Sequence, residues 1–239
     1  MANELVIQDF ISRTVSVNGL PIHFVHGGAG APLVLIHGGG NDWHEWSANM
    51  KALSTVAEIF ALDFPGFGLS GKPEALITAE WLAEFMKSFL DAVALKEAAM
   101  AGQSIGGLVA ADFAMKYPAR VKKLVLVDSA GMGKIGPIGW LFDRYFSALA
   151  RIKKIERGPR YMPGTEPGLF TAAQLRGLKM PVLIVWGEKD HYFPQSVAIK
   201  SGRFIPNSQL HIFPGCRHAP QREDAAHFNT LVCEFLTEE

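Results

Sequence analysis

Ser104 lies in a segment whose residue types can turn a hydroxyl into a nucleophile. The segment reads Gly102-Gln103-Ser104-Ile105-Gly106, a G-x-S-x-G pattern that follows an apolar run and opens a helical pattern. Such a tight turn from strand to helix strains the serine backbone, and glycines without a Cβ atom let the two elements approach. The turn also places the serine at a helix amino terminus, which favours developing negative charge. We therefore predict that Ser104 is a catalytic nucleophile.

Serine is a weak nucleophile near neutral pH and needs a neighbouring base. Among the eight histidines, His218 follows the apolar run 210–213 and precedes the last helical pattern of the chain. A loop at the end of a late strand is where a base could reach Ser104. We therefore predict His218 as the general base.

The base needs an acid that holds its tautomer and stabilises its charged form. Asp190 follows the apolar run 182–185 and is our first prediction, while Asp128, after the run 124–127, stays open as the alternative. Asp63 also follows an apolar run, but the tight turn after it indicates a structural role. The predicted order is serine, aspartate, histidine.

A tetrahedral oxyanion needs preorganised hydrogen-bond donors. One predicted donor is the backbone N–H of Ile105, directly after the nucleophile, and the second is that of Gly39, with Gly40 as the alternative. His37, which opens this glycine-rich loop, is predicted to be structural. A substrate pocket is predicted from neighbours of these motifs and from the following insertion: Gly40, Trp43, Gln103, Trp140, Phe146 and Ala219.

Eight short apolar runs supply the elements that must position these residues. The first two, 14–17 and 22–25, flank Asn18-Gly19, which is typical of a hairpin turn. Later runs alternate with helical patterns at 79–95, 104–117 and 223–236, which predicts a mostly parallel sheet covered by helices on both faces. The further runs are 32–36, 59–62, 98–101, 124–127, 182–185 and 210–213.

Residues 131–177 interrupt this alternation and are predicted to form a helical lid, with a helix at about 138–155. The predicted core then consists of 1–130 and 178–239. The insertion holds eight Lys or Arg residues against three Asp or Glu residues, whereas the whole chain has a formal net charge of zero. The simplest interpretation is a solvated basic helix face, and the sharper hypothesis is that one arginine binds a carboxylate of the substrate.

Composition excludes several other classes of function. Zero net charge argues against nucleic acid as a partner, and no apolar stretch is long enough to span a bilayer. Two cysteines without metal-binding spacing predict no disulfide framework and no metal site. The amino terminus lacks the apolar core of a signal peptide. We expect a cytoplasmic monomer or homodimer, without stable membrane association, that needs no cofactor and acts on a small-molecule substrate.

Together these motifs resemble the α/β-hydrolase superfamily over nearly the whole chain. They are His37 to Gly40, Asp63 to Ser70, Gly102 to Gly107, Trp186 to Asp190 and Arg217 to Pro220. The resemblance implies the α/β-hydrolase fold and a Ser-His-Asp triad. Within the superfamily, the chain is similar to esterases and to meta-cleavage-product C–C hydrolases. The latter often show H-G-G-G-P-G and G-N-S-M-G-G, where this chain has Asn41-Asp42 after the glycines, Gln103 and Ile105.

These departures favour an ester over a C–C bond as the substrate. Our first hypothesis is a carboxylesterase for small to medium apolar acyl groups that works through an acyl-enzyme. The second is a C–C hydrolase of dienoic keto acids. A third, of another class, is a low-turnover ligand receptor on the same fold, and a cofactor-free lyase or perhydrolase also stays open.

Overall fold

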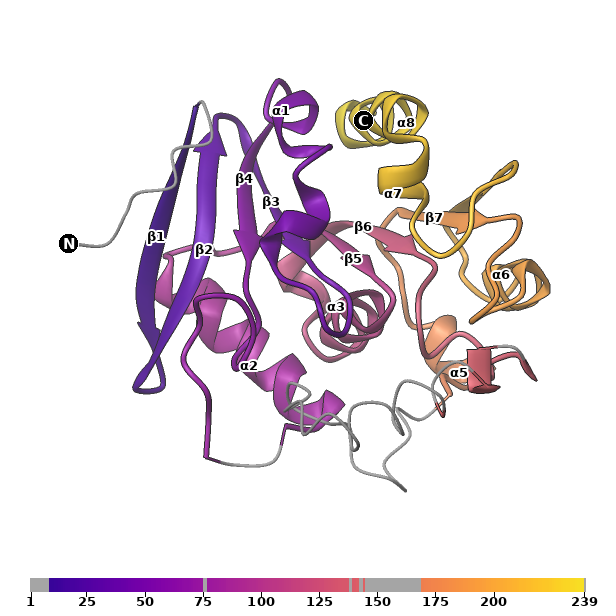
Figure 1. Ribbon diagram of the computed structural model, residues 1–239, viewed down its shortest axis with the longest axis horizontal. Helices are drawn as coiled ribbons and strands as arrows, with labels where there is room; N and C mark the ends of the chain where they lie inside the picture. Colours follow the sequence, from indigo (N-terminus) through magenta and orange to yellow (C-terminus); the bar gives the residue numbers. More distant parts are fainter. Residues whose placement is uncertain (1–8, 75–76, 138, 142–143, 145–168, 239) are drawn as a thin grey trace.

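A computed structural model of the chain describes residues 9–74, 77–137, 139–141, 144 and 169–238 (Figure 1). Its centre is an eight-stranded sheet in the order β1-β2-β4-β3-β5-β6-β7-β8. Strands β3 to β8 run parallel to one another, and β2 is antiparallel to both β1 and β4. The strands are β1 (Phe10–Val17), β2 (Leu20–Gly28), β3 (Ala31–Ile36), β4 (Ala57–Leu62), β5 (Ala98–Gln103), β6 (Val121–Val127), β7 (Val182–Gly187) and β8 (Ser208–Phe213).

All eight predicted strands are confirmed, and so is the first hairpin. Val17 pairs with Leu20 across a two-residue turn. Asn18 and Gly19 both take positive φ angles, 51° and 85°. This conformation matches the twist of the two strands and is accessible to asparagine and glycine, which explains why the turn could be located from the sequence.

The sheet buries apolar side chains on both faces. In β3, Val34 and Ile36 belong to one core cluster, while Leu33 and Leu35 belong to the other. This alternation requires an apolar residue at every position, because each face of the strand is covered. Fully burying one such side chain contributes about 2 kcal/mol, so the centre of the sheet is a rigid base for residues at its strand ends.

Helices cover both faces, as predicted. Helices α2 (Ala79–Ala92), α3 (Ile105–Lys116) and α6 (Gln195–Gly202) lie on one face, and α1 (Met50–Leu53) and α8 (Ala225–Thr237) lie on the other (Figure 1). The predicted helical patterns therefore correspond to α2, α3 and α8. The short helical segments and α6 were not predicted, because one or two turns carry too little periodicity. The short segments besides α1 are η1 (Trp43–Trp46), η2 (Pro118–Arg120), α5 (Ala172–Leu175) and α7 (Pro220–Glu223).

The predicted lid lies between β6 and β7. Its first residue is joined to a residue in its last part, because the Phe170 N–H donates to the Gly131 carbonyl at 2.8 Å. The Gly136 N–H donates to the Tyr192 carbonyl at 2.7 Å, so the start of the insertion packs on the loop after β7. Most of the predicted helix at 138–155 lies outside the described residues, and the division into core and lid stays a prediction.

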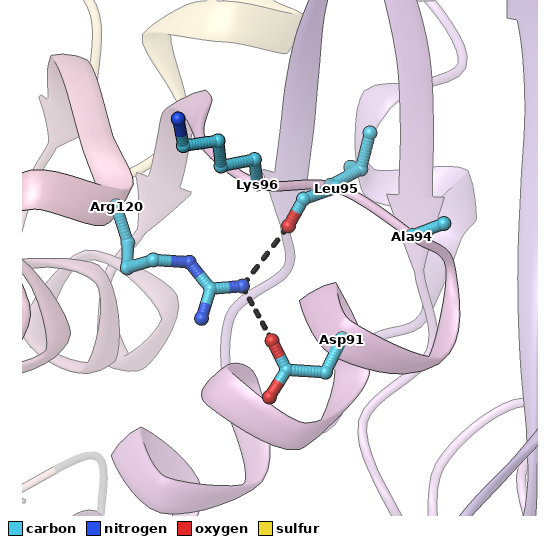
Figure 2. A pocket seen from close by; sticks show the side chains of 5 residues that line it. All are labelled: Asp91, Ala94, Leu95, Lys96 and Arg120. Atoms are coloured by element: carbon cyan, nitrogen blue, oxygen red, sulfur yellow. Dashed lines mark hydrogen bonds and ion pairs between the residues drawn. The ribbon is translucent and has the colours of Figure 1, made fainter.

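A shallow hollow is lined by Asp91, Ala94, Leu95, Lys96 and Arg120 (Figure 2). Arg120 there donates to the Asp91 carboxylate at 2.7 Å and to the Leu95 carbonyl at 2.9 Å. The hollow adjoins the amino ends of β5 and β6, whereas Ser104 follows the carboxyl end of β5. Ligands of parallel sheets bind at the carboxyl ends of strands, so this hollow is not the expected substrate site. In the part of the chain that the structure describes, no helix is long and apolar enough to cross a bilayer.

Candidate active site

Ser104 sits on a strained turn between β5 and α3. Its φ and ψ are 51° and −114°, a conformation that non-glycine residues rarely adopt. The surrounding backbone holds this turn in place. The Ser104 N–H donates to the Val127 carbonyl at 2.9 Å, and its carbonyl accepts from the N–H groups of Leu108 and Ala130 at 3.1 and 3.0 Å. Such strain persists only where the surroundings impose it, and it is a mark of functional sites.

Close contacts with neighbouring atoms explain why this motif needs glycines. A Cβ atom on Gly102 would lie 2.3 Å from the Gly106 carbonyl oxygen, and one on Gly106 would lie 2.3 Å from the Ile36 carbonyl oxygen. One on Gly107 would lie 2.6 Å from Ser129 Oγ. Helix α3 can therefore lie close to β5 and β3 only without these side-chain atoms, as the motif predicts.

His218 and Asp190 form a hydrogen-bonded pair. His218 Nδ1 lies 2.9 Å from Asp190 Oδ2. The other carboxylate oxygen, Oδ1, accepts from the backbone N–H groups of Tyr192 and Phe193 at 2.7 and 3.1 Å. The Asp190 side chain is fully buried, whereas that of His218 is 24% exposed. Asp190 can thus hold Nδ1–H of the ring and leave Nε2 free to accept a proton.

The loop that carries His218 is tied to the turn that carries Ser104. Gln103 Nε2 donates to the His218 carbonyl at 2.8 Å. The rings of Tyr192 and Phe193 flank the imidazole at centroid distances of 4.9 and 5.8 Å. Ser104 Oγ and the His218 ring make no direct hydrogen bond in the described structure. In free enzymes such bonds are often long, and they tighten when substrate binds.

The predicted oxyanion loop, His37 to Gly40, lies beside Ser104. A Cβ atom on Gly39 would lie 2.9 Å from Ile105 Cδ1, so the loop backbone approaches the start of α3. As the first residue of α3, Ile105 has an N–H group without an acceptor in its own helix. Gly40 takes a φ of +79°, which glycine permits, and is exposed. The loop therefore stands where donors for an oxyanion are expected.

His37 is buried and structural, as predicted. Its Nδ1 donates to the Gly38 carbonyl at 2.7 Å, and its Nε2 accepts from the Phe64 N–H at 3.0 Å. Burial lowers the pKa of this imidazole and so favours the neutral ring, which can donate from one nitrogen and accept at the other. His37 thus joins the loop after β3 to the loop after β4.

Asp63 is likewise structural, in agreement with its prediction. Its carboxylate accepts from the N–H groups of Trp43 and Leu69 at 2.7 and 3.0 Å. It also pairs with His23 Nδ1 at 2.7 Å, while His23 Nε2 lies 2.7 Å from Ser12 Oγ. These residues form a hydrogen-bonded Ser-His-Asp chain, but Ser12 is in edge strand β1, without the turn and helix terminus that Ser104 has. Asp63 instead anchors the segment that follows the oxyanion loop.

Glu45 is a buried acid near the site that was not predicted from the sequence. Its carboxylate accepts from Gln221 Nε2 at 2.7 Å and from Asn41 Nδ2, and it lies 3.8 Å from Arg222 Nη1. Asn41 follows the oxyanion loop, and Gln221 follows the His218 loop, so Glu45 joins the two. A single acid between two buried tryptophans, in Trp43-His44-Glu45-Trp46, was the signal that could have indicated it.

We expect the Glu45→Gln substitution to change how stability depends on pH. Burial raises the pKa of Glu45 above its ordinary value of 4.5. A raised pKa in the folded state means that the contribution of Glu45 is complete below pH 4.5 and is lost as the pH rises through the folded pKa. Urea unfolding between pH 4 and 8 should therefore show the variant gaining stability relative to the unsubstituted protein as the pH rises. A difference that stays constant with pH would contradict this assignment.

The other predicted pocket residues lie in different environments. Gln103 is buried between the oxyanion loop and His218. Its Nε2 donates to the His218 carbonyl, and its Oε1 would lie 2.0 Å from a Cβ atom on Gly38. Trp43 is buried in the core cluster on the face of α1 and α8. Ala219 is half-buried and directly precedes α7. Trp140 is 57% exposed, and Phe146 lies outside the described residues.

One basic residue of the predicted lid contacts that tryptophan. The Arg144 guanidinium carbon lies 4.9 Å from the centroid of the Trp140 ring, a cation–π distance. Of the other basic residues of the insertion, Arg176 contacts the Phe204 ring at 5.2 Å. The hypothesis that a lid arginine binds a substrate carboxylate stays a prediction.

Comparisons with known proteins agree with this architecture. A family model described as alpha/beta hydrolase fold matches residues 31–153 and 138–225. The chain is 30% identical to 2-hydroxymuconate semialdehyde hydrolase of Pseudomonas sp. (strain CF600), over 95% of this chain and 94% of that protein. It is 29% identical to 2-hydroxy-6-oxo-2,4-heptadienoate hydrolase of Pseudomonas putida, over 96% and 97%.

Solved structures of two kinds of hydrolase are similar to this one. A meta-cleavage product hydrolase from Pseudomonas fluorescens IP01 has a TM-score of 0.78 at 25% identity, over 93% of this chain and 96% of that one. A carboxylesterase from Bacillus subtilis has a TM-score of 0.83 at 25% identity, over 97% and 93%. The fold, the order of its motifs and these matches lead to one conclusion: the chain belongs to the alpha/beta hydrolase fold family and is a hydrolase.

Proposed function

We propose that this hydrolase uses Ser104, His218 and Asp190 as a catalytic triad to cleave carboxylic esters of small to medium apolar acyl groups. The observation that carries the proposal is the strained Ser104 turn at the start of α3, tied through Gln103 to a hydrogen-bonded His218–Asp190 pair. A nucleophile at a helix amino terminus, a base and a buried acid are what acyl transfer requires.

In this mechanism Ser104 Oγ attacks the ester carbonyl while His218 Nε2 takes its proton. The N–H groups of Ile105 and Gly39 stabilise the oxyanion, and Asp190 stabilises the imidazolium. His218 then gives the proton to the leaving alkoxide, which departs as an alcohol. Water, activated by the same imidazole, hydrolyses the acyl-enzyme and frees Ser104.

C–C bond hydrolysis is the second candidate, because the names of the two sequence relatives above denote hydrolases of dienoic semialdehydes and keto acids. One chemical argument and one observation favour the ester. An alkoxide leaving group needs only the proton of His218, whereas a carbon leaving group must also be stabilised as it forms. In addition, the alignment with the Pseudomonas sp. relative extends over 267 positions, which exceeds the 239 residues of this chain. The relative therefore has segments that this chain lacks.

Assaying the two substrate classes in parallel distinguishes these candidates. We expect hydrolysis of a p-nitrophenyl butyrate probe with a kcat/KM at least about 100-fold above that for 2-hydroxy-6-oxohexa-2,4-dienoate, a difference of about 2.7 kcal/mol in transition-state binding. The reverse ratio would favour the C–C hydrolase. Tight binding of either compound with almost no turnover would instead favour a ligand receptor.

A further inference from the structure

Asp128 is a buried carboxyl group directly behind the His218–Asp190 pair, and the mechanism above does not use it. It follows β6, and its N–H donates to the Val185 carbonyl at 3.0 Å. Its side chain is inaccessible to solvent, and its φ is +43°. One oxygen of Asp128, one of Asp190 and one ring nitrogen of His218 all lie within 4.8 Å of one another. Two strand ends thus bring two carboxyl groups to one imidazole.

The hydrogen bonds of Asp128 leave one of its oxygens without a donor. Oδ1 accepts from the Gly187 N–H at 2.9 Å. No described residue donates a hydrogen bond to Oδ2, which is fully buried. A buried carboxylate oxygen with no donor is costly, and a second carboxylate beside it adds repulsion. A proton placed between Asp128 and Asp190 removes both costs, because one carboxyl group then donates to the other.

The electrostatics of the site agree with this arrangement. Burial, and then the charge of Asp190, raise the pKa of Asp128 well above its ordinary value, and the more distant Glu223 of α7 adds to the effect. The Gly187 N–H acts in the opposite direction. Among the described residues, two further titratable groups face Asp128, namely His218 and the Cys216 thiol, both in the loop after β8. Burial and the neighbouring carboxylate thus both favour the protonated form of Asp128.

We propose that Asp128 is a reserve acid of this active site, which shares one proton with Asp190 and can take over the stabilisation of His218. This inference rests on the proposed function, since it assigns a role toward the same base. In the unsubstituted protein Asp128 is a positioning residue that acts through Asp190. When position 190 has no charge, burial still raises the pKa of Asp128, but the repulsion by a neighbouring carboxylate is gone. We therefore expect Asp128 to ionise more readily next to the imidazole.

The Asp190→Asn substitution creates that situation. The amide that it introduces can still accept from the N–H groups of Tyr192 and Phe193 through its oxygen, and its nitrogen can donate to an Asp128 oxygen. An amide toward His218 Nδ1 would otherwise favour the wrong tautomer, which costs a triad about 10⁴-fold in kcat. With Asp128 as a reserve acid, we expect the loss in kcat/KM for the butyrate ester to be only about 10²-fold, against the 10⁴-fold of an unassisted triad.

The test is to introduce Asp128→Asn into three backgrounds and to measure kcat/KM together with thermal unfolding. In the unsubstituted protein we expect a loss of about threefold, since asparagine keeps a donor toward Asp190. In Asp190→Asn we expect a further loss of at least about tenfold, because no carboxyl group remains to stabilise the imidazolium. In His218→Ala we expect a change below about twofold, because there is then no imidazole to stabilise.

The dependence on background separates this role from a purely structural one. If Asp128→Asn costs the same factor in all three backgrounds, residue 128 acts only through folding or packing, and the inference is wrong. The two proposals can fail separately. If Ser104→Ala keeps full ester turnover, the proposed function fails, whereas equal rates for Asp190→Asn and the double variant overturn only the role of Asp128.

Discussion

A Ser104→Ala variant is expected to lose about 10⁴-fold or more of the kcat for ester hydrolysis, because it removes the atom that forms the acyl-enzyme. The residual rate would come from the oxyanion donors and from substrate binding alone. The loss should appear in kcat and not in KM, since a hydroxyl on this strained turn contributes little to binding of the ground state. Steady-state rates with p-nitrophenyl butyrate measure both parameters.

Two further measurements make this prediction specific. A fluorophosphonate should label the unsubstituted protein at Ser104 and should leave the variant unlabelled, as intact-mass spectrometry can show. Ser54→Ala is the matched control, since Ser54 follows α1 and its hydroxyl donates to the Lys51 carbonyl at the other end of the sheet. Full turnover by Ser104→Ala, or labelling at another serine, would contradict the assignment of the nucleophile.

The second large effect is expected from Gly106→Ala. Helix propensity alone predicts that alanine stabilises a helical glycine position by about 1 kcal/mol. At Gly106 the new Cβ atom would lie 2.3 Å from the Ile36 carbonyl oxygen and 2.6 Å from that of His37. Both are backbone atoms of the strand and loop that lead to the oxyanion donors, so they cannot move without cost. We expect a destabilisation of at least about 2 kcal/mol and a loss of most activity.

Gly202→Ala provides the comparison for this prediction. Gly202 ends α6, and a Cβ atom there would meet only the tip of the Ile184 side chain, at 3.2 Å. We expect its stability to stay within about 1 kcal/mol of the unsubstituted protein, with activity retained. Chemical denaturation of the two variants measures the difference between their free energies of unfolding. Equal stability for both would mean that the close approach of α3 to β3 does not constrain residue 106.

The eight strands could be located from the sequence because sheet burial on two faces leaves a plain signal. Strand β3 needs apolar side chains at every position, and residues 33–36 have them. The Ser104 turn was equally visible, since only glycine fits at 102 and 106 and the pattern is therefore local. That His218 and both candidate acids lie near one another could also be expected, because the carboxyl ends of parallel strands meet at one edge of the sheet.

The sequence by itself determined the strands of the sheet, the turn at Ser104 and the candidates for base and acid. Each of these depends on local backbone geometry or on residue type. Only the tertiary structure decided which of two aspartates bonds to His218, because Asp128 and Asp190 follow neighbouring strands and look alike in the chain. It alone brought Glu45 to Gln221, 176 residues away. Contacts between distant loops depend on how the chain packs, and no local pattern records that.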